Sequence, residues 1–168
     1  MQKAITKIRK AIPADVDRIW QFWKTIMDQK VYFPYDDSYS RAQIEASWIN
    51  FDNNMYVAEI DEVIVGAYIL KANQPGYGNH IVNAAYMVDT DFRGRGIGGQ
   101  LCKHSIEAAR ELGYRGMQFN LVVSTNESAI RAWKANGFEI IGTVPGGFYH
   151  YEKGYVDAYI FFKDLLKT

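Results

Sequence analysis

The feature that most constrains this chain is a glycine-rich stretch between a predicted strand and a predicted helix. Its residues, in order, are Arg93, Gly94, Arg95, Gly96, Ile97, Gly98 and Gly99. Glycines leave backbone N–H groups uncovered, and here those groups converge at the positive end of the following helix. Two arginines add positive charge. The stretch therefore predicts an anion site sized for a phosphate or pyrophosphate, and the alternative interpretation is a flexible surface turn.

The hydrophobic pattern predicts an α/β (α+β) fold in one domain over residues 1–168. Strands are expected at 3–12, 55–60, 63–71, 80–89, 117–123, 138–144 and 155–165, and helices from Pro13 onward and at 41–50, 96–112 and 126–136. Consecutive strands favour antiparallel pairing, whereas the strand–helix–strand unit from 80 to 123 favours one parallel pair. The prediction is a mixed, mostly antiparallel sheet of about seven strands with helices on both faces. Residues 31–39 and 145–154 are expected to be loops.

Charge and composition exclude several classes of protein. Lys plus Arg and Asp plus Glu both number 19, so the chain lacks the basic excess of a general nucleic-acid binder. No apolar run approaches the ~20 residues of a membrane span. Cys102, the one cysteine, cannot form an internal disulfide, so a reduced, cytoplasmic location fits best. No metal site is expected, because Cys102 and His104 do not face each other on a helix.

Two other phosphate-binding motifs fit less well. Gly94, Gly96 and Gly99 satisfy the spacing of a dinucleotide-binding loop. That loop needs an acidic residue about 20 positions further on, at the end of the next strand, to hold a ribose. The next strand reads MQFNLVVST and has no acid. A nicotinamide-dependent dehydrogenase is therefore the second choice for the ligand, and the absence of GKS or GKT argues against a P-loop.

Two linked motifs make the chain resemble the GCN5-related N-acetyltransferase (GNAT) family. The first is Arg93, Gly96 and Gly98, which match Arg or Gln, two residues, Gly, one residue, Gly or Ala. The second motif opens a helix with an Asn and leaves it through Gly-Phe, and its residues are Asn126, Ala129, Trp133, Gly137 and Phe138. The order of elements also matches, so the resemblance covers nearly the whole chain. The tail GYVDAY weakly resembles the phosphinothricin and amino-acid acetyltransferase subgroup.

The resemblance implies that acetyl-CoA, or free coenzyme A, is the bound ligand. Residues 93–99 would hold its pyrophosphate through backbone N–H groups, and Met87 and Val88 would pair with the pantetheine arm. The strands at 80–89 and 117–123 would part near Met87, where the open backbone polarises the thioester and stabilises an oxyanion. Asn126 would contact the arm or the loop, although it also suits a helix cap. Trp133 stands where many relatives have an acidic Tyr, so we expect it to pack on the arm instead, or simply to belong to the core.

The catalytic groups beyond Met87 are less defined. Asn83 stands where related phosphinothricin acetyltransferases have a Glu, and an amide positions a water or the amine but does not take a proton. The remaining candidates for the base are Tyr86, Asp157, Tyr159 and a chain of waters. The proton donor is also open, because the coenzyme A thiol, with a pKa of ~8.5, can leave as thiolate without much help.

The acceptor is expected to be a primary amine of a small molecule or amino acid. Two aromatic regions, residues 32–37 and 148–151, would wall its pocket, with Asp36 and Asp37 suiting a cation. The substrate-binding candidates are Tyr32, Phe33, Tyr35, Asn83, Tyr149 and Tyr159. A plain packing role for these aromatic residues is equally consistent with the sequence. Other functions left open are a non-catalytic acetyl-CoA-binding module and a protein or peptide N-acetyltransferase. The Tyr-rich C-terminal strands also offer an edge for a homodimer.

Overall fold

The computed structural model describes residue 5 and residues 7–167, and its framework is one seven-stranded sheet in the order β1-β2-β3-β4-β5-β7-β6. The strands are β1 (Lys7–Lys10), β2 (Asn54–Ile60), β3 (Val63–Ala72), β4 (Ile81–Val88), β5 (Gly116–Val123), β6 (Glu139–His150) and β7 (Gly154–Asp164). Every pair is antiparallel except β4 with β5. The predicted mixed sheet is therefore confirmed.

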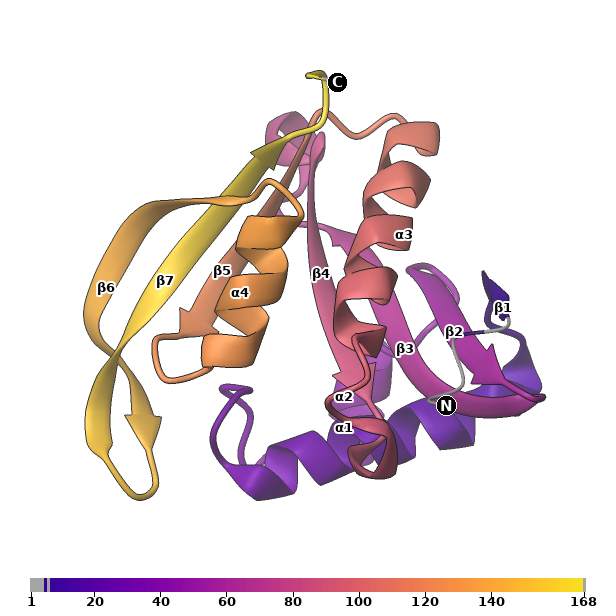
Figure 1. The fold of residues 1–168 in the computed structure, drawn as a ribbon, viewed down its shortest axis with the longest axis horizontal. Coiled ribbons are helices and arrows are strands. Elements are labelled where there is room, and N and C mark those ends of the chain that lie inside the picture. The colour runs from indigo at the N-terminus through magenta and orange to yellow at the C-terminus, as the bar shows by residue number, and fades with distance from the viewer. Residues whose placement is uncertain (1–4, 6, 168) are drawn as a thin grey trace.

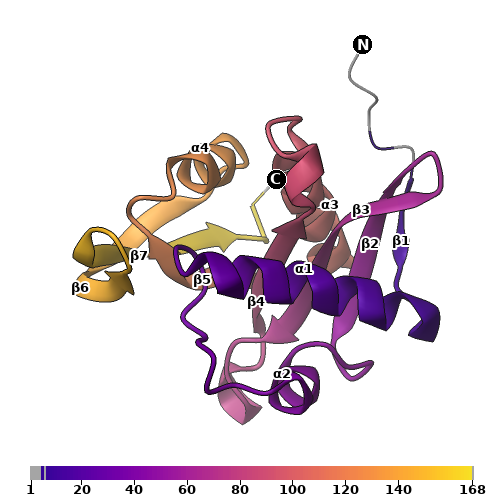
Figure 2. The same cartoon turned by 90° about the horizontal axis from the view of Figure 1, so that it is seen from below.

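Four α-helices cover the two faces of this sheet. They are α1 (Val16–Gln29), α2 (Arg41–Ser47), α3 (Ile97–Glu111) and α4 (Glu127–Ala135). Figure 2 shows α1 and α2 on one side of the strands and α3 and α4 on the other. Each side has its own buried core: Trp23, Ile44 and Ile69 belong to the first, and Leu101, Met117 and Phe161 to the second. Helices on both faces were expected, because α1 and α3 each carry one apolar stripe.

The parallel strands β4 and β5 meet at one end only. Their pairing comprises Ile81 with Gly116 and Val82 with Met117, and ends there. Figure 1 shows the two strands together at one end and apart at the other. The predicted separation is confirmed, and it begins at Asn83 rather than near Met87. The outer edge of each strand stays paired, β4 with β3 and β5 with β7, so the sheet is open only between β4 and β5.

Local sequence signals account for several element boundaries. Ser40 caps α2 in a capping box with Gln43, as Ser at an N-cap followed by Gln three residues later predicts. The β2–β3 turn places Asp61 and Glu62 at φ of 50° and 68°, so both central residues of this two-residue hairpin have the positive φ that a tight hairpin requires. Helix α3 ends before Gly113, whose φ is 85°.

Three sequence-based boundaries need correction. Residues 145–154 are not a loop throughout, because β6 runs to His150 and pairs with β7 across an irregularity between Val144 and Phe148. Two adjacent glycines and a proline in this stretch mimic a loop, but they lie on the edge strand of the sheet, where a missing donor is tolerated. The first strand is limited to Lys7–Lys10, and part of the prediction for 3–12 falls outside the described residues. The second helix ends at Ser47 instead of residue 50.

Candidate functional site

The glycine loop follows β4 and leads directly into α3. Gly94 and Gly96 both have φ of 74°, a left-handed conformation that glycine adopts at little cost. A Cβ built on Gly94, Gly96, Gly98 or Gly99 would meet nothing within 4 Å, so this side of the loop faces open space. Within the described residues, the N–H groups of 94–99 have no hydrogen-bond acceptor. Free N–H groups at a helix N-terminus are the arrangement that binds a phosphate.

A network of polar contacts fixes the loop against α1. Arg18 on α1 forms an ion pair with Asp89, which also accepts a hydrogen bond from the Asp91 N–H at 3.0 Å. The Arg93 guanidinium donates to Gln29 at the end of α1 at 3.0 Å, and it lies 5.8 Å from the centre of the Tyr32 ring. The Arg93 side chain therefore connects the glycine loop to the segment that follows α1.

The register of β4 determines which backbone groups face the opening. The Asp89 N–H donates to the Val65 carbonyl at 2.8 Å, and Met87 pairs with Ala67 in the same alternation. Met87 therefore directs its N–H and C=O toward β3, and its side chain is buried on the α1 side. The structure does not support Met87 as the exposed backbone group that the sequence suggested.

The alternate residues of β4 direct their backbone groups the other way. Ala84, Tyr86 and Val88 face the side where β5 has moved off, and no strand pairs with them there. An extended ligand could pair with this free edge as an added strand does. Of the residues predicted to contact such a ligand, Val88 has the orientation required.

A cavity of about 680 Å³ links the glycine loop, the opening between the strands and the segment after α1. It collects most of the predicted site. The predicted residues that line it are Tyr32, Phe33, Tyr35, Asn83, Tyr86, Val88, Arg93, Gly94, Gly96, Ile97, Gly98, Gly99, Asn126, Ala129 and Trp133. The predicted residues outside its lining are Met87, Arg95, Tyr149 and Tyr159.

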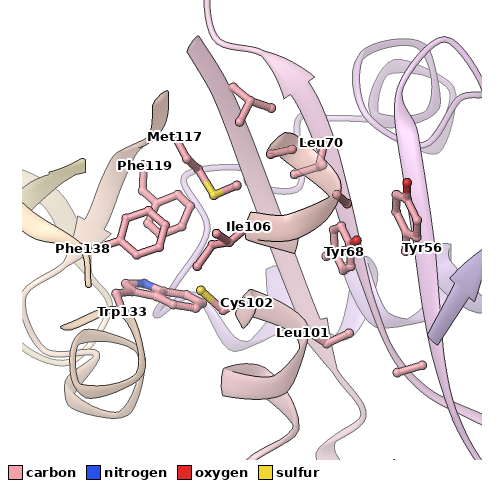
Figure 3. Packing of buried hydrophobic residues seen from close by; sticks show 14 of the residues in the cluster. Tyr56, Tyr68, Leu70, Leu101, Cys102, Ile106, Met117, Phe119, Trp133 and Phe138 are labelled. Carbon is pink, nitrogen blue, oxygen red and sulfur yellow. The ribbon is translucent and has the colours of Figure 1, made fainter. Parts of the chain in front are cut away.

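Helix α4 forms the β5 side of the cavity. Asn126 accepts a hydrogen bond from the Ala129 N–H at 3.3 Å, so it caps the helix and also lines the cavity. Trp133 lies 4.8 Å from the Tyr86 ring and 5.1 Å from the Phe119 ring, centre to centre. Figure 3 shows its indole beside Cys102, with Phe119 and Phe138 nearby. Trp133 is 9% exposed, so its ring is part of the buried core and also lines the cavity.

Tyr86 is a poor candidate for a base. Its hydroxyl lies 2.7 Å from Ser105 Oγ, and Ser105 donates its own proton to the Cys102 carbonyl at 2.7 Å. The Tyr86 O–H is therefore the donor to Ser105 and points into the α3 core. Burial raises its pKa well above the ordinary value, so the phenolate is disfavoured.

The α1 side of the cavity is a chamber walled by aromatic rings. We call Trp23, Phe33, Tyr35 and Trp48 the aromatic box. The Trp23 ring centre is 4.9 Å from that of Phe33, 5.7 Å from that of Tyr35 and 5.5 Å from that of Trp48. Burial raises the pKa of Tyr35, whose hydroxyl accepts a hydrogen bond from Trp48 Nε1 at 2.7 Å. The Trp23 Nε1 atom is buried and has no partner among the described residues.

Sequence reasoning missed part of this chamber. Trp23 lies on the buried face of α1, as the apolar spacing along this helix predicts, and its ring also borders the cavity. Trp48 and Asn120 were not singled out, and both line it. The Asn120 side chain donates to Asn73 at 2.6 Å, across the end of the opening. No pattern in the sequence marks these residues, because they meet only after β4 and β5 separate.

Several acceptor-side predictions need correction. Asp36 and Asp37 are exposed and do not line the cavity, and Asp36 instead accepts hydrogen bonds from Ser38. Tyr149 is 63% exposed and packs on Tyr155, at a ring distance of 5.1 Å, in the part of the β6–β7 hairpin that extends beyond the cavity. None of residues 148–151 lines the cavity, and Tyr151 instead borders an adjacent pocket together with Tyr32 and Arg93.

Two further base candidates also lie elsewhere. Asp157 accepts a hydrogen bond from the Gly146 N–H at 3.0 Å and so stabilises the irregularity in β6. Tyr159 packs against Phe161 and the core on the α3 side, with the two ring centres 6.5 Å apart. Among the residues that the structure describes, the cavity lining contains no carboxylate, histidine or lysine, and Arg93 is its one cation.

The described residues show neither a metal centre nor a membrane-spanning helix. In the described part of the chain, no group of three His, Cys, Asp or Glu side chains is arranged to hold a metal ion. None of the described helices is both long enough and apolar enough to cross a membrane.

Known proteins resemble this chain in sequence and in fold. Residues 18–138 match the sequence profile of the Acetyltransferase (GNAT) family. The N-acetyltransferase aca1 of Schizosaccharomyces pombe is 36% identical over 99 residues, which are 58% of this chain and 47% of that protein. Protein SPT10 of Saccharomyces cerevisiae is 33% identical over 81 residues, 48% of this chain and 13% of that protein. The chain thus spans about half of the first curated relative and a smaller part of the second.

Solved structures match over almost the full length. A GCN5-related N-acetyltransferase from Kribbella flavida is 34% identical with a TM-score of 0.89, covering 94% of this chain and 96% of that one. A phosphinothricin acetyltransferase of the GNAT superfamily from Sinorhizobium meliloti, solved in complex with acetyl-CoA, has a TM-score of 0.83 at 19% identity. The coverage is 94% of this chain and 87% of that one, and at this identity the likeness concerns the fold.

Proposed function

The chain belongs to the acetyltransferase (GNAT) family, and from this premise we propose that it transfers the acetyl group of acetyl-CoA to a primary amine of a small molecule or amino acid. The observation that carries the proposal is the continuity of one cavity. It runs from the glycine loop, past the free edge of β4, to the aromatic box. A donor with a phosphate-bearing end and an extended arm fits the first two parts, and an acceptor fits the third.

The residues at the glycine loop fit acetyl-CoA. The uncovered N–H groups of 94–99 would bind the pyrophosphate, supported by the dipole of α3, which has no acidic residue in its first turn. The backbone groups of Ala84, Tyr86 and Val88 would pair with the pantetheine arm. Asn126, Ala129 and Trp133 would pack on the arm from the other side.

Acetyl-CoA supplies an activated thioester. The protein polarises the thioester carbonyl, orients the amine and excludes water. The free N–H groups of β4 are fixed donors for the negative charge that develops on the carbonyl oxygen, and fixed donors of this kind act strongly in a site without water. Asn83 lies beside Ala85 on the cavity lining and would hold the amine or a water. The part of the lining that the structure describes offers no carboxylate, so the amine has to arrive neutral or lose its proton to water.

The first experiment separates catalysis from binding alone. Acetyl-CoA binding is measured by calorimetry, and release of the free thiol is measured with a panel of primary amines. We expect binding together with thiol release that depends on the amine, and a rate that rises with pH as the amine loses one proton. Binding without thiol release across a broad panel would favour a non-catalytic acetyl-CoA-binding module. Absence of binding would overturn the assignment of the loop.

Two secondary proposals concern the environment of the protein. Cys102 is buried and unpaired, which is consistent with a reduced, cytoplasmic location.

The sheet ends at β6, where Ile141 and Val144 are exposed. An unpaired edge strand with apolar side chains favours pairing with a second copy, and we propose a homodimer through this edge. Light scattering measures the molar mass of the wild type and of an Ile141→Lys variant. The wild type should be a dimer and the variant a monomer.

A further inference from the structure

The aromatic box is a rigid, flat-walled chamber. The other three rings lie with their centres 4.9–5.7 Å from that of Trp23, and the hydrogen bond from Trp48 Nε1 to the Tyr35 hydroxyl fixes two of them against each other. Outside the cavity lining, the exposed Tyr39 supports Tyr35 through an edge-on contact at 5.1 Å. Aromatic surfaces favour offset or edge-on contact with another flat apolar group. Because these four rings line the cavity, its lining on the α1 side favours a ring over a flexible chain.

The charges around the chamber oppose a second cation. Carboxylates are missing from the described lining. Lys71 extends beside the chamber: it pairs with Asn83 across β3 and β4, so both side chains lie on the same face of the sheet. Its ammonium lies 4.6 Å from the centre of the Trp48 ring and donates to the Ser47 carbonyl at 3.0 Å. Burial lowers the pKa of Lys71, as expected where no carboxylate compensates for lost water.

We propose that this chamber selects a primary monoamine carried on a flat, apolar body, such as an arylalkylamine, and rejects acceptors with a second positive charge. The inference deepens the proposed function and rests on it. Phe33 and the other rings supply the preference for the flat body. Lys71 supplies the rejection, because it already occupies one face of Trp48 and repels a second ammonium in a chamber of low polarity.

Three amines of similar length isolate the two effects. They are 2-phenylethylamine, hexylamine and 1,6-diaminohexane. 2-Phenylethylamine and hexylamine differ in the flat ring, and hexylamine and 1,6-diaminohexane differ in the distal ammonium. We expect kcat/KM to be about fivefold higher for 2-phenylethylamine than for hexylamine, the size of one aromatic contact. We expect it to be about fivefold lower for 1,6-diaminohexane than for hexylamine, counted per amine group, with a smaller difference at high salt.

Two variants assign these preferences to residues. Lys71→Gln should raise kcat/KM for 1,6-diaminohexane about threefold relative to hexylamine, and leave the KM for acetyl-CoA unchanged. Lys10→Gln is the matched control, because Lys10 is exposed on the edge strand β1 and does not line the cavity. Phe33→Leu removes one ring at a half-buried position and should lower kcat/KM for 2-phenylethylamine by a larger factor than kcat/KM for hexylamine. Melting temperatures verify that each variant is folded.

The outcomes separate this inference from the proposed function. Equal use of hexylamine and 1,6-diaminohexane by the wild type, or a Lys71→Gln variant with an unchanged ratio, would overturn the selection while leaving acetyl transfer intact. If no amine releases thiol, acetyl transfer is contradicted, and calorimetric binding of the three amines to the protein with coenzyme A still ranks them. The same order of affinities would support the chamber's selectivity, and any other order would refute it.

Discussion

The two ends of the cavity are built in different ways. At the glycine loop, the groups proposed to bind the pyrophosphate are backbone N–H groups that have no acceptor in the described chain, and four glycines leave them uncovered. At the aromatic box, the walls are large side chains from α1, from the segment after it and from Trp48. One end presents polar backbone at a helix N-terminus, and the other presents rings and few polar atoms.

This difference has a chemical reason. A pyrophosphate is the same in every molecule of acetyl-CoA, so a fixed backbone arrangement suffices to bind it. An acceptor has its own shape and charge, and only side chains supply a matching surface. Substitutions at the two ends should therefore alter different kinetic constants. The four predictions below test that separation, beginning with the largest expected effect.

Gly96→Asp should weaken acetyl-CoA binding by about 100-fold or more. Gly96 has φ of 74° at the N-cap of α3, so any side chain is strained there, and a carboxylate adds repulsion where phosphates would bind. Gly96→Asn is the matched control, because Asn tolerates positive φ and carries no charge. It should lose about tenfold or less. Calorimetry with acetyl-CoA measures both, and equal affinities for the two variants would contradict binding of the phosphates at this loop.

Val88→Pro should raise the KM for acetyl-CoA about tenfold. The substitution removes one N–H that faces the opening, and it leaves the hydrogen bonds between β4 and β3 intact because Val88 does not donate to β3. Val88→Ala keeps the N–H and trims the same side chain, so it should change this KM by no more than about threefold. Steady-state kinetics at saturating amine distinguish them. If the alanine variant is impaired as much as the proline variant, side-chain packing rather than backbone pairing holds the arm.

Tyr35→Ala should raise the KM for the amine up to about tenfold and leave the KM for acetyl-CoA unchanged. The variant loses a wall of the aromatic box and the partner of Trp48 Nε1. Tyr149→Ala is the internal comparison, because Tyr149 is largely exposed and outside the cavity lining. It should change either constant by less than about twofold. An effect of Tyr149→Ala on the amine would return the 148–151 segment to the acceptor site.

The same contrast explains how much the sequence alone could predict. The glycine loop, the cap at Asn126 and the parting of β4 and β5 were predicted, because each depends on residues that are near one another in the chain or on a recognisable motif. The location of the free backbone groups was not, since moving by one residue along β4 reverses the direction of every N–H and C=O. The sequence motif indicates the strand, whereas only the observed pairing with β3 excludes Met87.

The acceptor side was predicted less well for a related reason. Aromatic residues at 32–35 and at 148–151 look equivalent in the sequence, but the second group lies on a hairpin that extends beyond the cavity. Trp48 enters the chamber because α2 ends one residue before it and packs on α1. Such placements depend on contacts between segments distant in the chain, and periodicity within one segment carries no information about them.

Trp133→Phe tests the boundary between the two ends and should have the smallest effect. Trp133 stands at the position of an acidic Tyr in many relatives, but its indole N–H is a donor that does not ionise. The ring packs between Tyr86 and Phe119 at the opening, so Phe preserves the apolar contact and removes only the N–H. We expect kcat within about threefold of the wild type and a change of about threefold in the KM for acetyl-CoA.

A loss of about 100-fold in kcat is the size expected for a missing general acid. That result would mean that Trp133 orders the proton donor for the thiolate, and the clear division between a backbone end and a side-chain end of the cavity would no longer hold. Trp133→Leu, which also removes the aromatic face, should raise the KM for acetyl-CoA further while kcat changes little, because packing on the arm is the contribution assigned to the ring.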